Sequence, residues 1–500
     1  MPVSPARMFA QLSSATPPDS GPVLMRRAVV LGASVAGLLA ARVLSDHCDE
    51  VVLIERDPTV SGGSARPGVP QGTQVHSLLP AGQAQLERWF PGFFADSVAA
   101  GSVVAAPELA MFFMNGALRS FPAPAGATPS LLNTRPFLEE QIRRRTMALP
   151  RVRLLVGRAD GLLFAGDKVT GVRYVPSGPD AEAGPEDLPA DLVVDATGRS
   201  SRLPDWLAAD GWPRPPMRRM GIKLNYATAL FDRSLPDDQA AVVIAHTTAD
   251  SGQRPRIGGI LPVEGQRWMM LVAGYDGDRP SRSPDDFAQR CREDFPSAFG
   301  AIASTCPRVS DVVTYHQADS RRRDFHRLDR FPAGLVVAGD AVASFNPVYG
   351  QGMASAALHA SCLSEYLRSA PDLSRPAMAY FDLVKVIMDA AWQVSTLADL
   401  ALPHVDGPYP RGYRVQKWLG NLIYAAATDD RLVSDRLNLV ATMQGHPSML
   451  ATPAVLLHAL GHRVRLGLRP RPAPTESDPA PAVSEADLSR NAASLALAGH

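Results

Sequence analysis

The sequence predicts a mixed α/β fold (α+β overall), in which a parallel-sheet domain is interrupted by an antiparallel β-sheet domain and followed by helices. A short apolar run, a helical stretch and a second apolar run form a β-α-β pattern near the N-terminus: RAVVLG, SVAGLLAARVLSDH and EVVLIERD. This pattern favours a parallel sheet. Two similar apolar runs, DLVVDATG and GLVVAGDA, return much later. Residues 217–274 lie between them and are rich in β-prone segments, so the first domain is expected to be discontinuous.

Composition fits an ordinary globular protein. Of the 500 residues, 46% are hydrophobic and 20% are charged, as in typical soluble domains. Lys plus Arg and Asp plus Glu both total 50, so no global field favours nucleic acid or an anionic membrane. Four cysteines (Cys48, Cys291, Cys306 and Cys362) show no metal-ligand spacing and no disulfide framework, which favours a reducing, cytoplasmic setting. We expect no signal peptide, no transmembrane segment and no metal.

The domain boundaries follow from these patterns. We expect a flexible N-terminus over residues 1–25 and a disordered Pro/Ala-rich tail over 466–500. The remaining segments are assigned to the parallel-sheet domain (26–104, 131–210 and 320–370), the β-rich domain (105–130 and 211–319) and a C-terminal helical region (371–465).

Local signals support the intervening elements. The pair Asn115-Gly116 stands between two β-prone runs in MFFMNGALRSF, the strongest short hairpin signal. The stretch RPFLEEQIRRRTMAL reads as a helix with Pro136 in its first turn. VRLLVGRADGLLFAGDKVTGVRYVP reads as a small antiparallel meander.

The first chemical motif is GASVAG, residues Gly32, Ala33, Ser34, Val35, Ala36 and Gly37. It fits G-x-G-x-x-G with a serine in place of the second glycine, between a strand and a helix. Such a Rossmann-like turn lets the backbone approach a pyrophosphate at a helix N-terminus. Glu55 ends the next strand, where an acid binds an adenosine ribose; Arg56 follows it. The alternative is an ordinary β-α-β turn.

Two further motifs end strands later in the chain. One strand ends in Asp195-Ala196-Thr197-Gly198, and another in Gly339-Asp340, whose carboxylate could accept hydrogen bonds from sugar hydroxyls. The loop FNPVYGQGM then brings Pro347, Gly350 and Gly352 to a helix start near Met353. Unsatisfied backbone N–H groups at that start suit an electron-rich oxygen or a ring that develops negative charge.

Together the three motifs resemble those of the FAD-dependent monooxygenases of the para-hydroxybenzoate hydroxylase type. This resemblance implies a Rossmann-like FAD-binding domain of the glutathione-reductase type and covers most of residues 26–370. It places Glu55 on the adenosine ribose, Asp340 on the ribityl-pyrophosphate region and Gly352–Met353 near the flavin ring. It also implies cofactor contacts for Arg135, at the start of its helix, and for Ala159, near the adenine.

A finer resemblance is to bacterial polyether-type flavin epoxidases, which are similar in chemistry to squalene epoxidase. It rests on GVPQGTQVHSLLPAG and DAVASFNPVYGQGM. That subgroup reads VPQ-x-x-His-x-His; here Gln74 replaces the first histidine, and His76 is a candidate residue close to the flavin. The alternative for His76 is a structural role.

The resemblance implies that NADPH or NADH, or a separate flavin reductase, reduces the flavin. Oxygen transfer through a flavin C4a-hydroperoxide to an alkene or aromatic carbon would follow. We expect a lipophilic secondary-metabolite precursor, most simply a polyene, as in antibiotic biosynthesis. Alternating positions in the β-rich domain are candidate pocket residues, although they could equally be sheet core: Met111, Phe113, Leu224, Tyr226, Ile260 and Met270.

Two other functions fit the same fold. One is a flavin-dependent reductase of polyprenyl double bonds, which needs no oxygen. The other is a non-catalytic prenyl or lipid carrier, which would have no need of an intact flavin site. The chain is expected to be a monomer or a homodimer, with no nucleic-acid partner.

Overall fold

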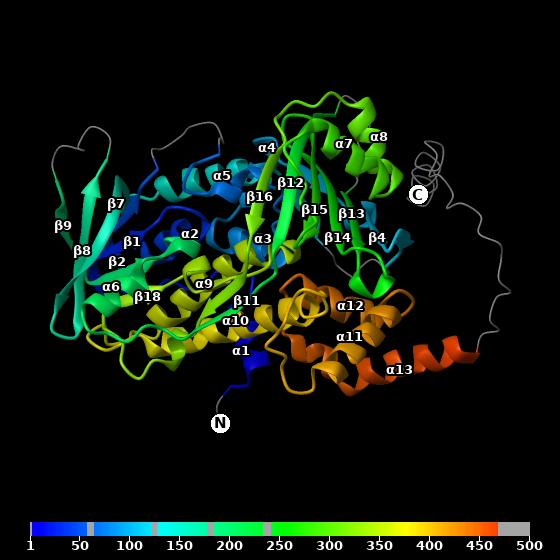
Figure 1. Ribbon diagram of the computed structural model, residues 1–500. Coiled ribbons are helices and arrows are strands. Elements are labelled where there is room, and N and C mark those ends of the chain that lie inside the picture. Colours follow the sequence, from blue (N-terminus) through cyan, green and yellow to red (C-terminus); the bar gives the residue numbers. More distant parts are fainter. Residues whose placement is uncertain (1–2, 58–64, 123–127, 178–183, 234–241, 469–500) are drawn as a thin grey trace.

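The computed structural model describes residues 3–57, 65–122, 128–177, 184–233 and 242–468. Figure 1 shows two large sheets side by side, with a long bundle of helices along one side of both. The first sheet, with its helices, lies at one end of the molecule. The second sheet stands at the other end, above the C-terminal helices. The predicted α/β class, with an inserted β-sheet domain, is confirmed.

The first sheet has the strand order β18-β10-β1-β2-β7-β8-β9. Its first five strands pair in parallel, and β7, β8 and β9 form an antiparallel meander. The strands are β1 (Met25–Leu31), β2 (Cys48–Glu55), β7 (Val152–Ala165), β8 (Lys168–Pro176), β9 (Glu186–Pro189), β10 (Leu192–Asp195) and β18 (Leu335–Val337). Both the β-α-β unit and the meander therefore lie where the sequence predicts them.

The parallel strands are buried on both faces. Helix α2 (Val35–Leu44) packs against β1, β2 and β10, and strand β8 of the meander also contacts β10, although the two are not neighbours in the sheet. The centres of β1 and β10 have no exposed side-chain surface, as at Val29, Val30 and Val193, and a strand buried on both sides reads as a continuous apolar run. The helices of this part are α2 (Val35–Leu44), α3 (Pro80–Trp89), α4 (Phe93–Ala99), α5 (Arg135–Met147), α6 (Leu203–Ala209) and α9 (Gln351–Arg368). Helix α5 begins beside Pro136, as predicted, with the Thr134 hydroxyl accepting from Phe137 N at 3.4 Å.

The second sheet has the strand order β16-β12-β15-β14-β13-β4-β5. Asn115 and Gly116 both have positive φ, 54° and 79°, at the predicted β4–β5 hairpin. Its strands are β4 (Ala110–Met114), β5 (Ala117–Arg119), β12 (Leu224–Asp232), β13 (Val242–Thr247), β14 (Arg256–Val263), β15 (Arg267–Tyr275) and β16 (Val313–Gln317). Smaller sheets join β3 (Val103–Ala105) to β6 (Ser130–Leu132), and β11 (Met217–Met220) and β19 (Ala343–Ser344) to β17 (Ser320–Arg323).

One face of the second sheet is covered by helices α7 (Pro284–Glu293) and α8 (Ser297–Thr305). Alternate residues of β12, such as Ala227 and Phe231, pack there against Phe287 and Phe299. The opposite face is turned toward the rest of the molecule, where Leu224 and Tyr226 belong to a different apolar cluster.

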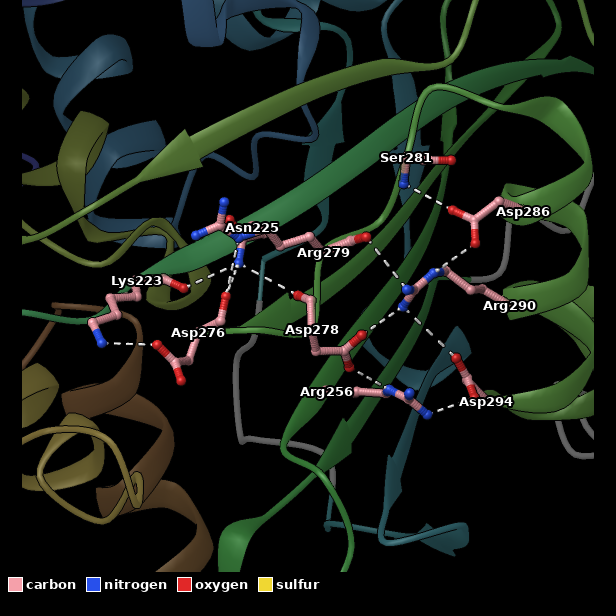
Figure 2. Close-up of polar contacts among 10 residues, drawn as sticks. All are labelled: Lys223, Asn225, Arg256, Asp276, Asp278, Arg279, Ser281, Asp286, Arg290 and Asp294. Atoms are coloured by element: carbon pink, nitrogen blue, oxygen red, sulfur yellow. Dashed lines mark hydrogen bonds and ion pairs between the residues drawn. The ribbon is translucent and has the colours of Figure 1, made fainter.

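A polar network attaches α7 to this sheet (Figure 2). The carboxylate of Asp278 accepts from Arg256 Nε at 2.7 Å and from Arg290 Nη1 at 2.8 Å. Asn225 Nδ2 donates to the carbonyl oxygens of Asp276 (3.1 Å) and Asp278 (3.4 Å). Burial alone would raise the pKa of Asp278, but hydrogen bonds from both arginines lower it overall. The network fixes α7 on the side of the sheet away from α9.

The N-terminus differs from the expectation of a flexible segment. Residues Pro5–Leu12 form helix α1, capped by Ser4, whose side chain accepts from Arg7 N. Phe9 and Leu12 are buried in the main core. Burial of these two apolar side chains therefore anchors a segment that composition alone predicted to be flexible.

The C-terminal region is helical, as predicted: α10 (Met378–Asp399), α11 (Tyr413–Ala427), α12 (Arg431–Ala441) and α13 (Pro453–Leu468). The last three pack around Ile423, Ala426, Val433 and Ala459. Among the described residues, no helix is both long and apolar enough to cross a membrane. The tail was predicted over 466–500, but residues 466–468 belong to helix α13, and the rest of that segment lies outside the described residues.

Candidate functional site

A cavity of about 580 Å³ lies between the carboxyl ends of the parallel strands and the second sheet. The three sequence motifs meet there, because the strands that precede them, β1, β10 and β18, are neighbours in one sheet. Every residue that the sequence assigned to the cofactor lines this cavity except Gly37 and Gly339, which lie behind its wall.

The first motif brings backbone to the cavity wall. Gly32 has φ +92°, and a Cβ there would lie 2.7 Å from Ala196 O. A Cβ on Gly37 would lie 1.8 Å from Gly32 O, so α2 can pack this closely only with glycine. Ser34 takes the place of the second glycine; its Oγ donates to Glu139 Oε2 at 2.7 Å and accepts from Arg135 Nη2 at 3.1 Å.

Glu55 is held by the backbone around it. Its carboxylate accepts from Ala33 N at 2.8 Å and from Asp57 N at 3.1 Å, and Arg66 Nη1 lies 3.2 Å away. Burial alone would raise the pKa of Glu55, but Arg66 and these two backbone donors lower it overall. The carboxylate is therefore ionised and fixed beside the first motif.

Sequence reasoning missed the charged cluster around Glu139. This buried carboxylate contacts Arg66 and Arg143 and reaches the first motif through Ser34. Arg143 Nη2 also donates to Ala33 O at 2.8 Å. The available signal was the EExxRRR pattern of α5, which places Glu139 and Arg143 one helical turn apart.

The other two motifs complete the same wall. Gly339 has φ +63°, and a Cβ there would lie 2.6 Å from Ala36 Cβ; its N–H donates to His359 Nδ1 at 3.0 Å. Burial raises the pKa of Asp340, against the opposing effect of Arg135 and Arg199. Asp340 thus lines the cavity beside two arginines.

The loop Asn346–Gly350 carries the third motif to the cavity. Asn346 caps the turn Pro347–Tyr349 by accepting from Val348 N at 3.2 Å, and Gly350 turns into α9 with φ +66°. From behind, Asp399 at the end of α10 accepts from Asn346 Nδ2 at 2.7 Å and from Tyr349 Oη at 2.9 Å. The sequence gave no signal for this contact, because Asp399 lies 53 residues away in the chain.

Asp399 is a fully buried carboxylate, and among the described residues it forms no ion pair. Its Oδ2 has no hydrogen-bond partner. Burial raises the pKa of Asp399 to about 6, although the bonds from Asn346 and Tyr349 lower it.

The second sheet provides the opposite wall. The rings of Tyr226 and Tyr315 lie 5.6 Å apart, and both face the cavity with Gln317. His76 lines it too; its Nδ1 is 2.8 Å from Gln74 O. Since a carbonyl oxygen only accepts, Nδ1 carries the proton and Nε2 remains an acceptor. Desolvation, with Arg135 nearby, lowers the pKa of His76 to about 3.

Gln74, which replaces a histidine of the resembled subgroup, anchors this loop. It is buried; its Oε1 accepts from Thr228 Oγ1 at 2.7 Å, and its Nε2 donates to Val313 O at 3.3 Å. The substitution therefore attaches the His76 loop to β12 and β16.

The candidate pocket residues of the β-rich domain divide by sheet face. Only Tyr226 lines the cavity. Ile260 and Met270, with Met111 and Phe113, pack under α7 and α8 on the far face, and Leu224 packs against Leu400 and Leu402. Side chains do alternate between the two faces of the second sheet, but the sequence did not indicate which face would line the cavity.

The residues present fit FAD. Gly198, at positive φ, leaves room for a ligand against bare backbone, because a Cβ there would meet nothing within 4 Å. The family resemblance implies that Glu55 binds the ribose, that Arg135 and the first motif bind the pyrophosphate, and that Asp340 and the start of α9 bind the ribityl chain and the ring. Glu55, Arg135 and Asp340 all line the one cavity.

Comparisons with known proteins support FAD as the cofactor. A family model described as FAD binding domain matches residues 157–370. The chain is 31% identical over 457 residues to the protein Rv3254 of Mycobacterium tuberculosis, covering 88% of this chain and 94% of that protein. It is 28% identical over 430 residues to kynurenine 3-monooxygenase of Salinispora tropica, covering 82% and 84%.

Solved structures share the fold at lower identity. The flavin-dependent brominase Bmp2 superposes with a TM-score of 0.63 at 16% identity, over 88% of this chain and 99% of that one. The p-nitrophenol 4-monooxygenase PnpA of Pseudomonas putida superposes with a TM-score of 0.58 at 19% identity, over 84% and 99%. At such identities the likeness extends to the fold alone.

Proposed function

Because this chain belongs to the FAD-dependent monooxygenases of the para-hydroxybenzoate hydroxylase type, we propose that it inserts one oxygen atom of O2 into a lipophilic secondary-metabolite precursor. The reaction is epoxidation of an alkene in a polyene or polyketide, or hydroxylation. NADPH, NADH or a separate flavin reductase supplies two electrons, and the second oxygen atom leaves as water.

One observation carries this proposal: the cofactor wall and a wall of aromatic side chains enclose one cavity. FAD, when bound, supplies the redox chemistry and the activation of O2. A cofactor alone would need only the wall formed by the three sequence motifs. The opposite wall, with Tyr226 and Tyr315, supports a second, largely apolar molecule held against the ring.

The roles of the chain are to bind, to orient and to exclude water. The start of α9, where Gly350, Gly352 and Met353 line the cavity, presents unsatisfied backbone N–H groups that stabilise negative charge on a neighbouring ring. His76 is neutral and offers Nε2 as an acceptor within the cavity. No nucleophilic side chain is required for this chemistry.

The test is the visible spectrum of the purified protein, recorded anaerobically before and after adding NADPH and again after admitting air. We expect a flavin band that bleaches and then returns with formation of peroxide or oxygenated product. A band that NADPH and NADH leave unchanged, but that a flavin reductase bleaches, would assign reduction to a partner protein.

The same preparation separates the alternatives. A flavin-dependent reductase would saturate a polyprenyl substrate under nitrogen, with a gain of two hydrogens and no oxygen. A carrier would bind prenyl chains without any flavin. With 18O2 in the gas phase, a monooxygenase product gains one labelled atom, and a product formed equally well under nitrogen would contradict the proposal.

A further inference from the structure

Helix α13 has an apolar surface on the side that faces away from the protein. Val455 and Ala459 point inward and are buried. On the opposite side, Leu457, Leu460 and Val464 are 68%, 44% and 61% exposed. Their spacing of three and four residues places them on one line along the helix. We call these three residues the outward stripe.

Cations flank this line. Arg463 and Arg465 are exposed, and at 100° per residue they fall on opposite sides of the outward stripe. The guanidinium of Arg463 lies 5.8 Å from the ring of Trp418 on α11. Trp418 is 46% exposed, so it extends the apolar surface onto the neighbouring helix.

The sequence of α13, PAVLLHALGHRVRLGL, contains no carboxylate. The nearest acids by contact are Asp429 and Asp430 on the adjoining turn, and these pair with His462 and His458. The charged side chains of α13 itself are therefore all basic, although the whole chain has a formal net charge of +0. Asp429, on the adjoining turn, is 61% exposed.

We propose that α13, with Trp418, docks on an anionic lipid surface. An apolar line between two arginines, with a tryptophan at its edge, matches a helix that lies in the plane of a bilayer interface: the apolar side chains enter the acyl boundary and the cations meet headgroups. In a two-fold pairing of two copies through α13, the same patch faces itself, and arginine would meet arginine with no acid from either helix.

Figure 1 places α13 at the edge of the molecule, on the side away from α7 and α8. A protein bound through it keeps the β-sheet domain and the cavity clear of the lipid surface. The inference concerns location alone and holds whether or not the proposed oxygenation is correct.

The experiment is co-sedimentation of the full flavin-loaded chain with vesicles of phosphatidylglycerol and, separately, of phosphatidylcholine. We expect binding to the anionic vesicles that weakens with added salt, and little binding to the neutral ones. The triple variant Leu457→Ser, Leu460→Ser and Val464→Ser should lose at least about tenfold in partition coefficient, because each buried leucine contributes strongly. Arg463→Glu with Arg465→Glu should remove the salt dependence.

A matched control carries Leu118→Ser and Val309→Ser, two side chains that are 54% and 52% exposed elsewhere; its binding should equal that of the wild type. Flavin content and thermal unfolding establish that each variant is folded. Three results would overturn the proposal: no binding to anionic vesicles, equal binding by the triple variant, or a dimer that the triple variant converts to monomer. If vesicle binding appears only after truncation at Leu468, the C-terminal tail, and not lipid, occupies the outward stripe in the full chain, which would also overturn the proposal.

Discussion

The two walls of the cavity are built in different ways. The wall formed by β1, β10 and β18 presents backbone and small residues, with Gly32, Gly198 and Gly350 at positive φ. The opposite wall presents large side chains, Tyr226 and Tyr315, from the second sheet. A backbone wall is specified by glycine spacing, whereas a side-chain wall depends on which face of a sheet turns inward.

The largest effect is expected from breaking the backbone wall. Gly32→Val places a branched side chain where a Cβ alone would meet Ala196 O at 2.7 Å, at φ +92°. FAD affinity should fall more than about a hundredfold, which corresponds to about 3 kcal/mol. Titration of apo-protein with FAD, followed by flavin fluorescence, measures it. Gly161→Ala is the control, since its Cβ meets nothing within 4 Å; unchanged affinity in Gly32→Val would refute the assignment of this wall.

The next effect contrasts the two faces of the second sheet. Ile260→Ala leaves a cavity beneath α7 and α8 and should lower the free energy of unfolding by about 3–4 kcal/mol. FAD affinity of the folded protein should stay within about twofold, because Ile260 does not line the cavity. Denaturant unfolding and FAD titration measure the two quantities. A selective loss of FAD binding would place Ile260 in the site after all.

Asp399, behind the cofactor loop, gives a pH-dependent effect. Its folded pKa of about 6 lies above the ordinary value of 3.8, so the native state binds the proton more tightly than the unfolded state. The stabilisation of the folded protein that protonated Asp399 provides is therefore lost as pH rises from about 4 to 6. The total is about 3 kcal/mol at most, at 1.4 kcal/mol per pKa unit.

Asp399→Asn cannot ionise but keeps an oxygen that accepts from Asn346 and Tyr349. The stability of the variant relative to wild type, measured as the difference in their free energies of unfolding, should therefore increase from pH 4 to pH 7. The comparison of wild type with variant at each pH removes the contributions of other groups. The same difference at both pH values would show that Asp399 does not titrate in this range.

The smallest effect separates two tyrosines that line or support the cavity, Tyr349 and Tyr226. Tyr349→Phe removes the hydrogen bond to Asp399 and should cost about 1–2 kcal/mol, since a bond to a charged group is lost. Among the described residues the Tyr226 hydroxyl has no hydrogen-bond partner, so Tyr226→Phe should change stability by less than about 0.5 kcal/mol. Thermal unfolding of the two variants side by side checks this; equal costs would mean that Tyr226 has a partner in solution.

The difference between the walls also explains how far the sequence could lead. The strands, the β4–β5 hairpin and the motif residues from Gly32 to Met353 were predictable, because each depends on local turn chemistry or on a run of apolar residues. The contacts of Asp399, Glu139 and Arg66 were not, since they join segments far apart in the chain. The N-terminal helix α1 was missed because composition does not report the burial of Phe9 and Leu12.

The most direct test of the central claim is the flavin content of the purified protein. Acid denaturation should release one FAD per chain, identified by chromatography. Apo-protein should regain it on addition of FAD but not of FMN, because the cavity extends to Glu55, the residue predicted to bind the adenosine ribose. A protein that contains no flavin and takes up none would show that the cavity formed by the three motifs is not a flavin site.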